Sequence, residues 1–142
     1  MSKVLVLSIK PEYAAKIYSG EKRFEFRKAP PRNLNATYLI YESSPVSKIT
    51  GYVTFNASIT VRAHAMASVI SDFMSCAKGR AVKMMGISEK QLLDYAGNPN
   101  AFVTALMIGY ASKDSAFEKY KIRPPQNWGA VCPQGDGRGE RL

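Results

Sequence analysis

The sequence has few of the residues that build metal centres and disulfide frameworks. Its 142 residues include two cysteines, Cys76 and Cys132, and one histidine, His64. A zinc site usually needs three or four His and Cys ligands, and the two cysteines match no zinc or redox spacing. We therefore expect no metal centre or cofactor, although magnesium or manganese held by carboxylates is left open. The thiols are expected to be reduced in a cytoplasmic protein, because no export signal is found.

Long hydrophobic runs and acidic residues are also scarce. No stretch approaches the ~20 apolar residues that a membrane-spanning helix needs, so no membrane partner is expected. Eleven acidic residues stand against twenty Lys and Arg, which gives a net charge of +9. Such a surface attracts polyanions and speeds their encounter. RNA or a nucleotide is the partner that this charge favours, with single-stranded DNA as an alternative and a basic surface without a specific ligand as the simplest interpretation.

The order of expected elements indicates one α+β domain. Strands are expected at both ends of the chain and helices in the middle, which is typical of a small β-barrel with helical insertions. We place this domain at residues 1–133 and expect a flexible, glycine-rich tail at 134–142. About six strands are expected, at 4–9, 22–27, 37–41, 49–61, 102–111 and up to 131. About three helices are expected, at 11–19, 63–77 and from 88 to about 96, with a short extra turn at 81–85.

The segment from Gly20 to Lys28 carries the most informative charge pattern, because it reads G-E-K-R-F-E-F-R-K. Its alternation is that of a half-buried strand and predicts a core-facing pair and a charged set on the other face. The core-facing pair is Phe24 and Phe26, and the charged set is Arg23, Glu25 and Arg27. Such a strand, beside Lys22 in the turn, predicts a cradle for a phosphate or a polar base edge. The alternative is an amphipathic strand whose charges pair among themselves in solvent.

Other residues that could meet a ligand carry a weaker signal. Tyr38 and Tyr41 lie on opposite faces of one expected strand, so that one is core and the other could face a ligand. Ser43 and Ser44 could present backbone N–H groups to a phosphate, or they could form a plain turn. Trp128 could stack on a base, but a lone tryptophan beside a closing strand is more often part of the core.

The order of several segments resembles that of ASCH-domain proteins, which belong to the PUA-like superfamily of small β-barrels. The run from Leu7 to Arg27 is similar to the opening of these domains, residues 41–51 to their third-strand loop and next strand, 86–95 to their helical insertion, and 124–128 to their closing Pro-Gln-aromatic segment. The similarity extends over roughly residues 3–131. It implies a PUA-like barrel with a cleft between the first helix and the sheet, and a function in binding RNA or modified nucleosides.

One related group, the acetylcytidine amidohydrolases, carries Gly-x-Lys-Thr-x-Thr-x-Arg at this place, with its Lys as base, its second Thr as nucleophile and a distant Glu assisting. Lys22 and Arg27 match that pattern, but Arg23 and Glu25 stand at the two Thr positions. A carboxylate cannot simply replace an activated hydroxyl in amide hydrolysis, so the sequence argues against this deacetylation. Other members of the family have been described as ribonucleases. That chemistry needs a base for the ribose hydroxyl and a cation for the developing phosphorane charge.

Two functions therefore follow from the expected basic cleft around the Gly20–Lys28 segment. The first is an RNA- or nucleotide-binding domain in which Arg27 binds a phosphate or base edge through two hydrogen bonds and Lys22 adds a point charge. Glu25 would orient Arg27 or accept a hydrogen bond from a base amino group. The alternative is a ribonuclease or a hydrolase of modified nucleosides, with Lys22 and Glu25 as candidate catalytic residues. The expected ligand-binding residues are Lys10, Lys22, Arg23, Arg27, Tyr41, Ser43 and Ser44. A third interpretation, an accessory protein acting through a protein partner, has no distinct apolar stripe to support it.

Overall fold

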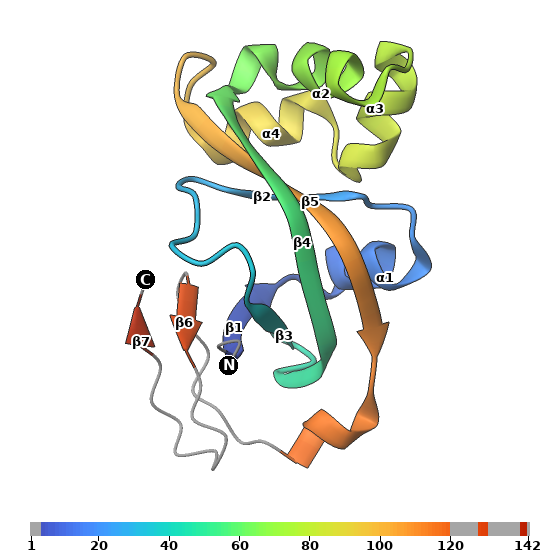
Figure 1. Cartoon of the computed structure of the whole chain (residues 1–142), viewed down its shortest axis with the longest axis vertical. Helices are drawn as coiled ribbons and strands as arrows, with labels where there is room; N and C mark the ends of the chain where they lie inside the picture. The colour runs from blue at the N-terminus through green and yellow to red at the C-terminus, as the bar shows by residue number, and fades with distance from the viewer. Residues whose placement is uncertain (1–3, 120–127, 131–139, 142) are drawn as a thin grey trace.

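The structure, a computed structural model, describes residues 4–119, 128–130 and 140–141 (Figure 1). It confirms the α+β class, and the expected strand at 102–111 is present. In chain order the elements are β1 (Val4–Ile9), α1 (Pro11–Ser19), β2 (Phe24–Arg27), β3 (Thr37–Glu42), β4 (Lys48–Arg62), the 3-10 helix η1 (Ala63–Ala65), α2 (Met66–Met74), α3 (Lys78–Met85), α4 (Glu89–Ala96), β5 (Phe102–Lys113), the 3-10 helix η2 (Ser115–Lys119), β6 (Trp128–Ala130) and β7 (Glu140–Arg141). This part of the chain has four α-helices rather than about three, because the expected turn at 81–85 is the second half of a full helix, α3.

Local sequence signals explain where α1 and α4 begin and end. Pro11 occupies the first turn of α1, where a missing N–H costs nothing, and Gly20 ends the helix with φ 85° and donates its N–H to the carbonyl of Ile17. Ser88 caps α4 through a reciprocal capping box with Gln91. Both helices therefore lie where the sequence predicts them.

The strands form one open sheet in the order β2-β5-β4-β3-β1-β6-β7. β1 pairs with β3 in parallel, and the other neighbours are antiparallel. β1 to β5 form the body of the sheet, and β6 and β7 extend it by short segments. β2 and β7 are its two edges, and no pairing between described residues joins them. The closed barrel expected from the sequence is therefore not supported, because the four residues of β2 pair with β5 alone.

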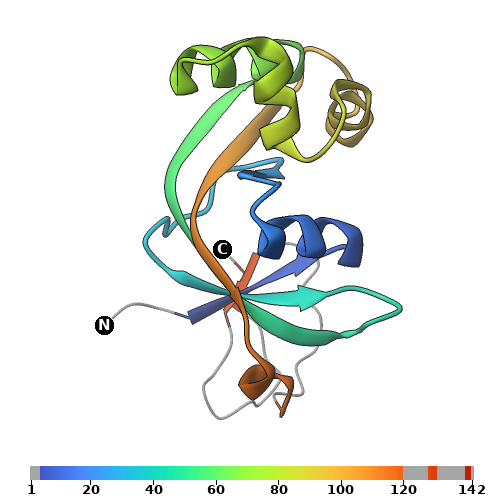
Figure 2. The ribbon, with the colours of Figure 1, turned by 90° about the vertical axis from the view of Figure 1, so that its right-hand side faces the viewer.

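β4 and β5 form a long, curved pair that links the layer of α2, α3 and α4 to the half of the sheet built with β1 and β3 (Figure 2). Their ladder is interrupted by a bulge at which the faces of the strands change. Phe55 pairs with Ile108, whereas Gly109 and Asn56 have no partner across the ladder, and pairing resumes at Tyr110. A Cβ at Gly109 would run into the side-chain amide of Asn56, so glycine allows the close approach. Consequently Ile108 faces the core beneath α1, and Tyr110 faces the opposite side.

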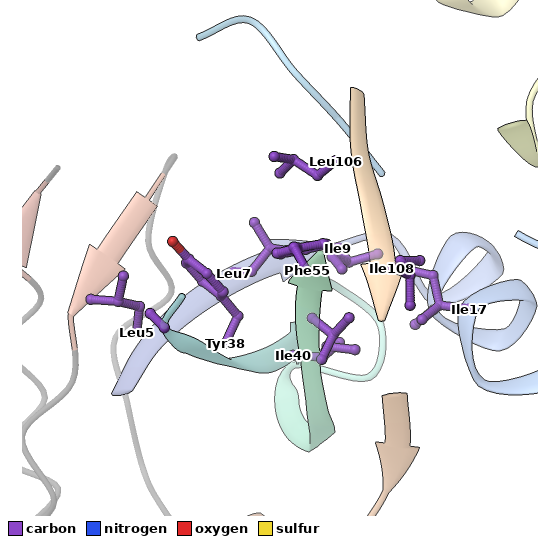
Figure 3. Close-up of a cluster of buried hydrophobic side chains, with 12 residues drawn as sticks. Leu5, Leu7, Ile9, Ile17, Tyr38, Ile40, Phe55, Leu106 and Ile108 are labelled. Carbon is purple, nitrogen blue, oxygen red and sulfur yellow. The ribbon is translucent and has the colours of Figure 1, made fainter. Parts of the chain in front are cut away.

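Two main hydrophobic clusters lie on opposite faces of this sheet, as the neighbours Ala105 and Leu106 of β5 show by belonging to different clusters. The first cluster packs under α1 and is drawn in Figure 3; its larger members are Leu5, Leu7, Ile9, Ile17, Tyr38, Ile40, Phe55, Leu106 and Ile108. The second cluster lies between β2, β4, β5 and the three helices α2 to α4; its larger members are Phe24, Phe26, Met66, Ile70, Met85, Leu92 and Val103. The prediction that Phe24 and Phe26 face the core is confirmed.

Several expectations concern residues outside the described ranges. The last expected strand is present as β6, but its end at Val131 and the expected tail at 134–142 fall outside them, apart from the two residues of β7. The same is true of Cys132, whereas Cys76 is a half-buried free thiol. In the described part of the chain, no helix has the length and hydropathy needed to cross a membrane.

Candidate functional site

A pocket with a volume of about 500 Å³ lies where the end of β1 and the start of α1 meet β2 and α4. This volume is within the usual range for sites that hold a small molecule. Its lining residues are Ser8, Ile9, Lys10, Tyr13, Lys22, Glu25, Phe26, Arg27, Ile87, Gln91, Asp94 and Tyr95. The pocket therefore combines two segments that are close in sequence, β1–α1 and β2, with a helix about 65 residues further on.

Lys22 contributes the most deeply buried charge of this pocket, with 1% of its surface exposed. Its Nζ donates a hydrogen bond of 2.6 Å to the carbonyl oxygen of Met85. It also lies 5.3 Å from the ring centroid of Tyr13 and 5.1 Å from that of Phe26, within range of cation–π attraction. The ammonium group is thus held by the C-terminus of α3 and two aromatic rings rather than by water.

Glu25 joins Lys22 to Arg27 and completes a buried triad of charges. Its Oε1 is 3.9 Å from Lys22 Nζ, and its Oε2 is 3.2 Å from Arg27 Nη2. Glu25 Oε1 also accepts the backbone N–H of Phe26, and Arg27 Nη2 donates to the carbonyl of Ser8 at 2.7 Å. The charges do pair among themselves, as the alternative interpretation expected, but the Glu25 and Arg27 side chains are only 9% and 11% exposed, so these pairs are buried and not in solvent. The triad carries a net charge of +1 when Lys22 is protonated.

Burial changes the protonation chemistry of Lys22. Desolvation lowers its pKa from 10.5 to about 8, and the attraction of Glu25 opposes this shift. A lysine with such a pKa is partly neutral near physiological pH, so it can either attract an anion or accept a proton. The site therefore suits both of the functions that the sequence suggests.

α4 supplies a wall of the pocket that sequence reasoning missed. Gln91, Asp94 and Tyr95 are three and four residues apart, and this spacing places them on one face of the helix. Burial raises the pKa of Tyr95, whose ring centroid lies 5.4 Å from Lys28 Nζ. The helical period was visible in the sequence, but nothing local indicated that this face turns toward β2.

The pocket is less basic than the sequence predicted. Its cations are Lys10, Lys22 and Arg27, and its carboxylates are Glu25 and Asp94. In the described residues, no group of three or more His, Cys, Asp or Glu is placed to hold a metal ion. The arrangement therefore favours a ligand with both an acidic group and hydrogen-bond donors, rather than a simple anion.

Four of the expected ligand-binding residues do not line this pocket. Arg23 precedes β2, so the strand alternation that should align it with Glu25 has not begun; its side chain is exposed. Tyr41 is 8% exposed and packs in a third cluster with Val6, Leu39 and Ile49, so the prediction that only one of Tyr38 and Tyr41 is core is wrong. Ser43 and Ser44 follow β3 in a turn, in which Ser43 N–H donates to the carbonyl of Ile9. Lys10, Lys22, Glu25 and Arg27 do line the pocket, as expected.

Gly86 lies against the aliphatic part of the Lys22 side chain. It ends α3 with φ 69°, and a Cβ there would lie 2.6 Å from Lys22 Cγ. Gly97 also has a positive φ, 96°, but a Cβ there would meet nothing within 4 Å. We expect Gly86→Ala to lower the free energy of unfolding by about 1 kcal/mol more than Gly97→Ala, because both strain the backbone and only one displaces the lysine stem. Urea unfolding of both variants measures the two free energies of unfolding. Equal losses would show that the Lys22 side chain can move away from the new methyl group at no cost.

Comparisons with known proteins agree with this architecture. The family model described as the ASCH domain matches residues 7–121. The crystal structure of ASCH from Zymomonas mobilis superposes with a TM-score of 0.71 at 24% identity, covering 98% of this chain and 97% of that one. A serine-to-alanine mutant of the Zymomonas mobilis protein gives a TM-score of 0.71 at 26% identity, covering 94% of this chain and 91% of that one. A tyrosine-to-phenylalanine mutant gives 0.70 at 26%, covering 94% and 93%. Among curated proteins, no sequence matches the chain.

Proposed function

The chain belongs to the ASCH domain family, and from this premise we propose that it binds RNA by taking one nucleotide into the pocket between α1, β2 and α4. The observation that carries this proposal is the buried Lys22–Glu25–Arg27 triad on the pocket wall. Families of this kind are thought to bind RNA, and a net charge of +9 favours a polyanion. The pocket volume of about 500 Å³ suits a single nucleotide, not a duplex.

The pocket offers separate groups for the phosphate and for the base of a nucleotide. Arg27 is fixed by Ser8 and Glu25, so its planar guanidinium is already oriented for a phosphate or a base edge. The rings of Tyr13 and Tyr95 line the same space and can stack on a base. Proteins that read RNA commonly unstack a single-stranded base and hold it between such rings. A single-stranded segment with one nucleotide turned into the pocket is therefore the ligand that fits.

Substitutions of Arg27 test directly whether the pocket binds RNA. We expect Arg27→Ala to weaken the binding of an eight-nucleotide, mixed-sequence RNA about tenfold, because the bidentate, charge-assisted hydrogen bonds of the guanidinium group are lost. Arg27→Lys should not restore binding, since lysine cannot form this bidentate pair. Fluorescence anisotropy at low and high salt measures both. Arg80→Ala is the matched control, because it removes one exposed arginine from α3 outside the pocket and leaves the net charge equal to that of Arg27→Ala.

The control also defines what would contradict the proposal. If Arg27→Ala and Arg80→Ala weaken binding equally, only net charge matters and the pocket is not the binding site. The same oligomer made as DNA separates RNA from single-stranded DNA. Tight binding of the DNA would show that the ribose hydroxyls are not recognised.

The alternative function is a ribonuclease or a hydrolase of modified nucleosides in the same pocket. The observation that favours it is the pKa of about 8 at Lys22, which suits a general base. To test this function, the protein is incubated with the eight-nucleotide RNA, and the length of the RNA is measured together with its binding. Cleavage that disappears in Lys22→Ala, in a protein that still binds RNA, would establish the enzyme. Intact RNA in the parent protein leaves binding as the function.

A further inference from the structure

The face of the sheet that carries Glu25 and Arg27 continues beyond the pocket. In the ladder, Arg27 lies opposite Thr104 of β5, and Thr104 lies opposite Thr60 of β4. The two threonine hydroxyls share a hydrogen bond of 2.8 Å. Since alternate residues of a strand share a face, the next positions on the same side are Phe102 and Arg62, which pair with each other.

Phe102 and Arg62 form a cation–π pair on this face. The Arg62 Cζ lies 4.7 Å from the centroid of the Phe102 ring. Arg62 Nη1 also donates to the carbonyl of Asn100 at 2.8 Å, which gives the guanidinium a second contact beside the ring. Phe102 nevertheless remains 55% exposed, so a large part of its side chain is open to a ligand. We call this pair the Arg62–Phe102 platform.

The two strands that form the platform, β4 and β5, carry no acidic residue. Neither β4 nor β5 contains an aspartate or glutamate over residues 48–62 and 102–113. Ser58 and Thr60 add exposed hydroxyls on the same face. The helices α2 to α4 cover the opposite face, where they pack on Ile59 and Val61. The part of this face that β4 and β5 form therefore combines hydroxyls, an arginine and an exposed aromatic ring with no acidic residue of either strand, and such a surface suits a single nucleic-acid strand.

The platform lies close enough to the pocket to take a neighbouring nucleotide. Strands are about 4.8 Å apart and residues rise about 3.3 Å, so the Cα atoms of Phe102 and Arg27 are about 8 Å apart. We propose that the Arg62–Phe102 platform stacks a base of the single-stranded RNA next to the nucleotide held in the pocket. This inference rests on the proposed function and adds the path of the strand, from the edge of β2 across β5 to β4.

The test compares a short ligand with a long one. We expect Phe102→Ala to weaken binding of the eight-nucleotide RNA about fivefold or more, since base stacking on an aromatic ring is lost. Binding of nucleoside monophosphates, measured by calorimetry, should not change. Tyr110→Ala is the matched control: Tyr110 belongs to the same strand and is 58% exposed, but it faces the opposite side of the sheet. Thermal unfolding of both variants confirms that they are folded.

The outcomes separate this inference from the proposed function. Unchanged affinity of Phe102→Ala for the RNA, or an equal loss in Tyr110→Ala, overturns the platform while leaving the pocket intact. A loss in Phe102→Ala with no loss in Arg27→Ala overturns the pocket and keeps the platform. If Phe102→Ala also loses the monophosphates, the residue acts on the pocket and the strand path is wrong.

Discussion

Replacing Glu25 by alanine should lower the free energy of unfolding by about 3 kcal/mol, because it removes the countercharge that lies 3.9 Å from the buried ammonium of Lys22. The Glu25 carboxylate lies within 4 Å of both Lys22 Nζ and Arg27 Nη2. Without it, two cations whose side chains are 1% and 11% exposed would remain close together on one wall of the pocket. Urea unfolding at pH 7 measures the loss.

Two further variants show whether the loss comes from the buried charge. Glu25→Gln keeps the size of the side chain and an acceptor for the Phe26 N–H, so it should lose less than Glu25→Ala. Glu118→Ala breaks an exposed ion pair with Lys48, at 3.4 Å, and should cost less than about 1 kcal/mol. Similar losses in Glu25→Ala and Glu118→Ala would mean that water reaches the triad and screens it.

Stability should rise with pH between about pH 8 and pH 10, and Lys22 should be the cause. Its pKa is about 8 in the folded protein and 10.5 in the unfolded chain. In this window the unfolded chain binds more protons than the folded protein, so raising the pH favours the folded state. Lys22 contributes about 2 kcal/mol over these two pH units, and the difference between the parent and the Lys22→Met variant gives this contribution. Below pH 8 the lysine is charged in both states, and its burial cost is then fully present.

The window ends near pH 10 because buried tyrosines act in the opposite direction. Burial raises the pKa of Tyr18 and Tyr38 to about 12, so above pH 10 the unfolded chain loses protons first and stability falls. Urea unfolding at pH 8, 9 and 10 measures the slope, and Lys22→Met is the control that should abolish the rise. A parent protein with a flat profile would show that Lys22 keeps an ordinary pKa.

Much of the fold could be predicted because its signals are local. Pro11 and Gly20 delimit α1, the Ser88–Gln91 capping box begins α4, and alternation marks β2. Each of these signals acts within one helical turn or one strand. Sheet closure is not a local property. Whether β2 pairs on one side or on both depends on segments far away in the sequence, and the expectation of a closed barrel was not supported for that reason.

In the candidate site, too, local sequence signals identified some residues, whereas the others depend on tertiary packing. Lys22, Glu25 and Arg27 could be singled out because they lie within six residues of one strand and its turn. Tyr41 was misplaced because alternation tells which residues share a face, but not what covers that face. Asp94 and Tyr95 were missed because their contact with the pocket depends on how α4 packs against the sheet.

The sequence by itself determined the charge of this protein, the limits of most of its helices and strands, and the order of groups in the Gly20–Lys28 segment. Only the tertiary structure decided that these charges are buried. The carbonyl of Met85 from α3, the ring of Tyr13 from α1 and the carbonyl of Ser8 from β1 replace the water around Lys22 and Arg27. The physical reason is that desolvation depends on every neighbour in space, and those neighbours come from three different elements, one of them about 60 residues away. That desolvation is what lowers the pKa of Lys22 toward the range in which it can do chemistry.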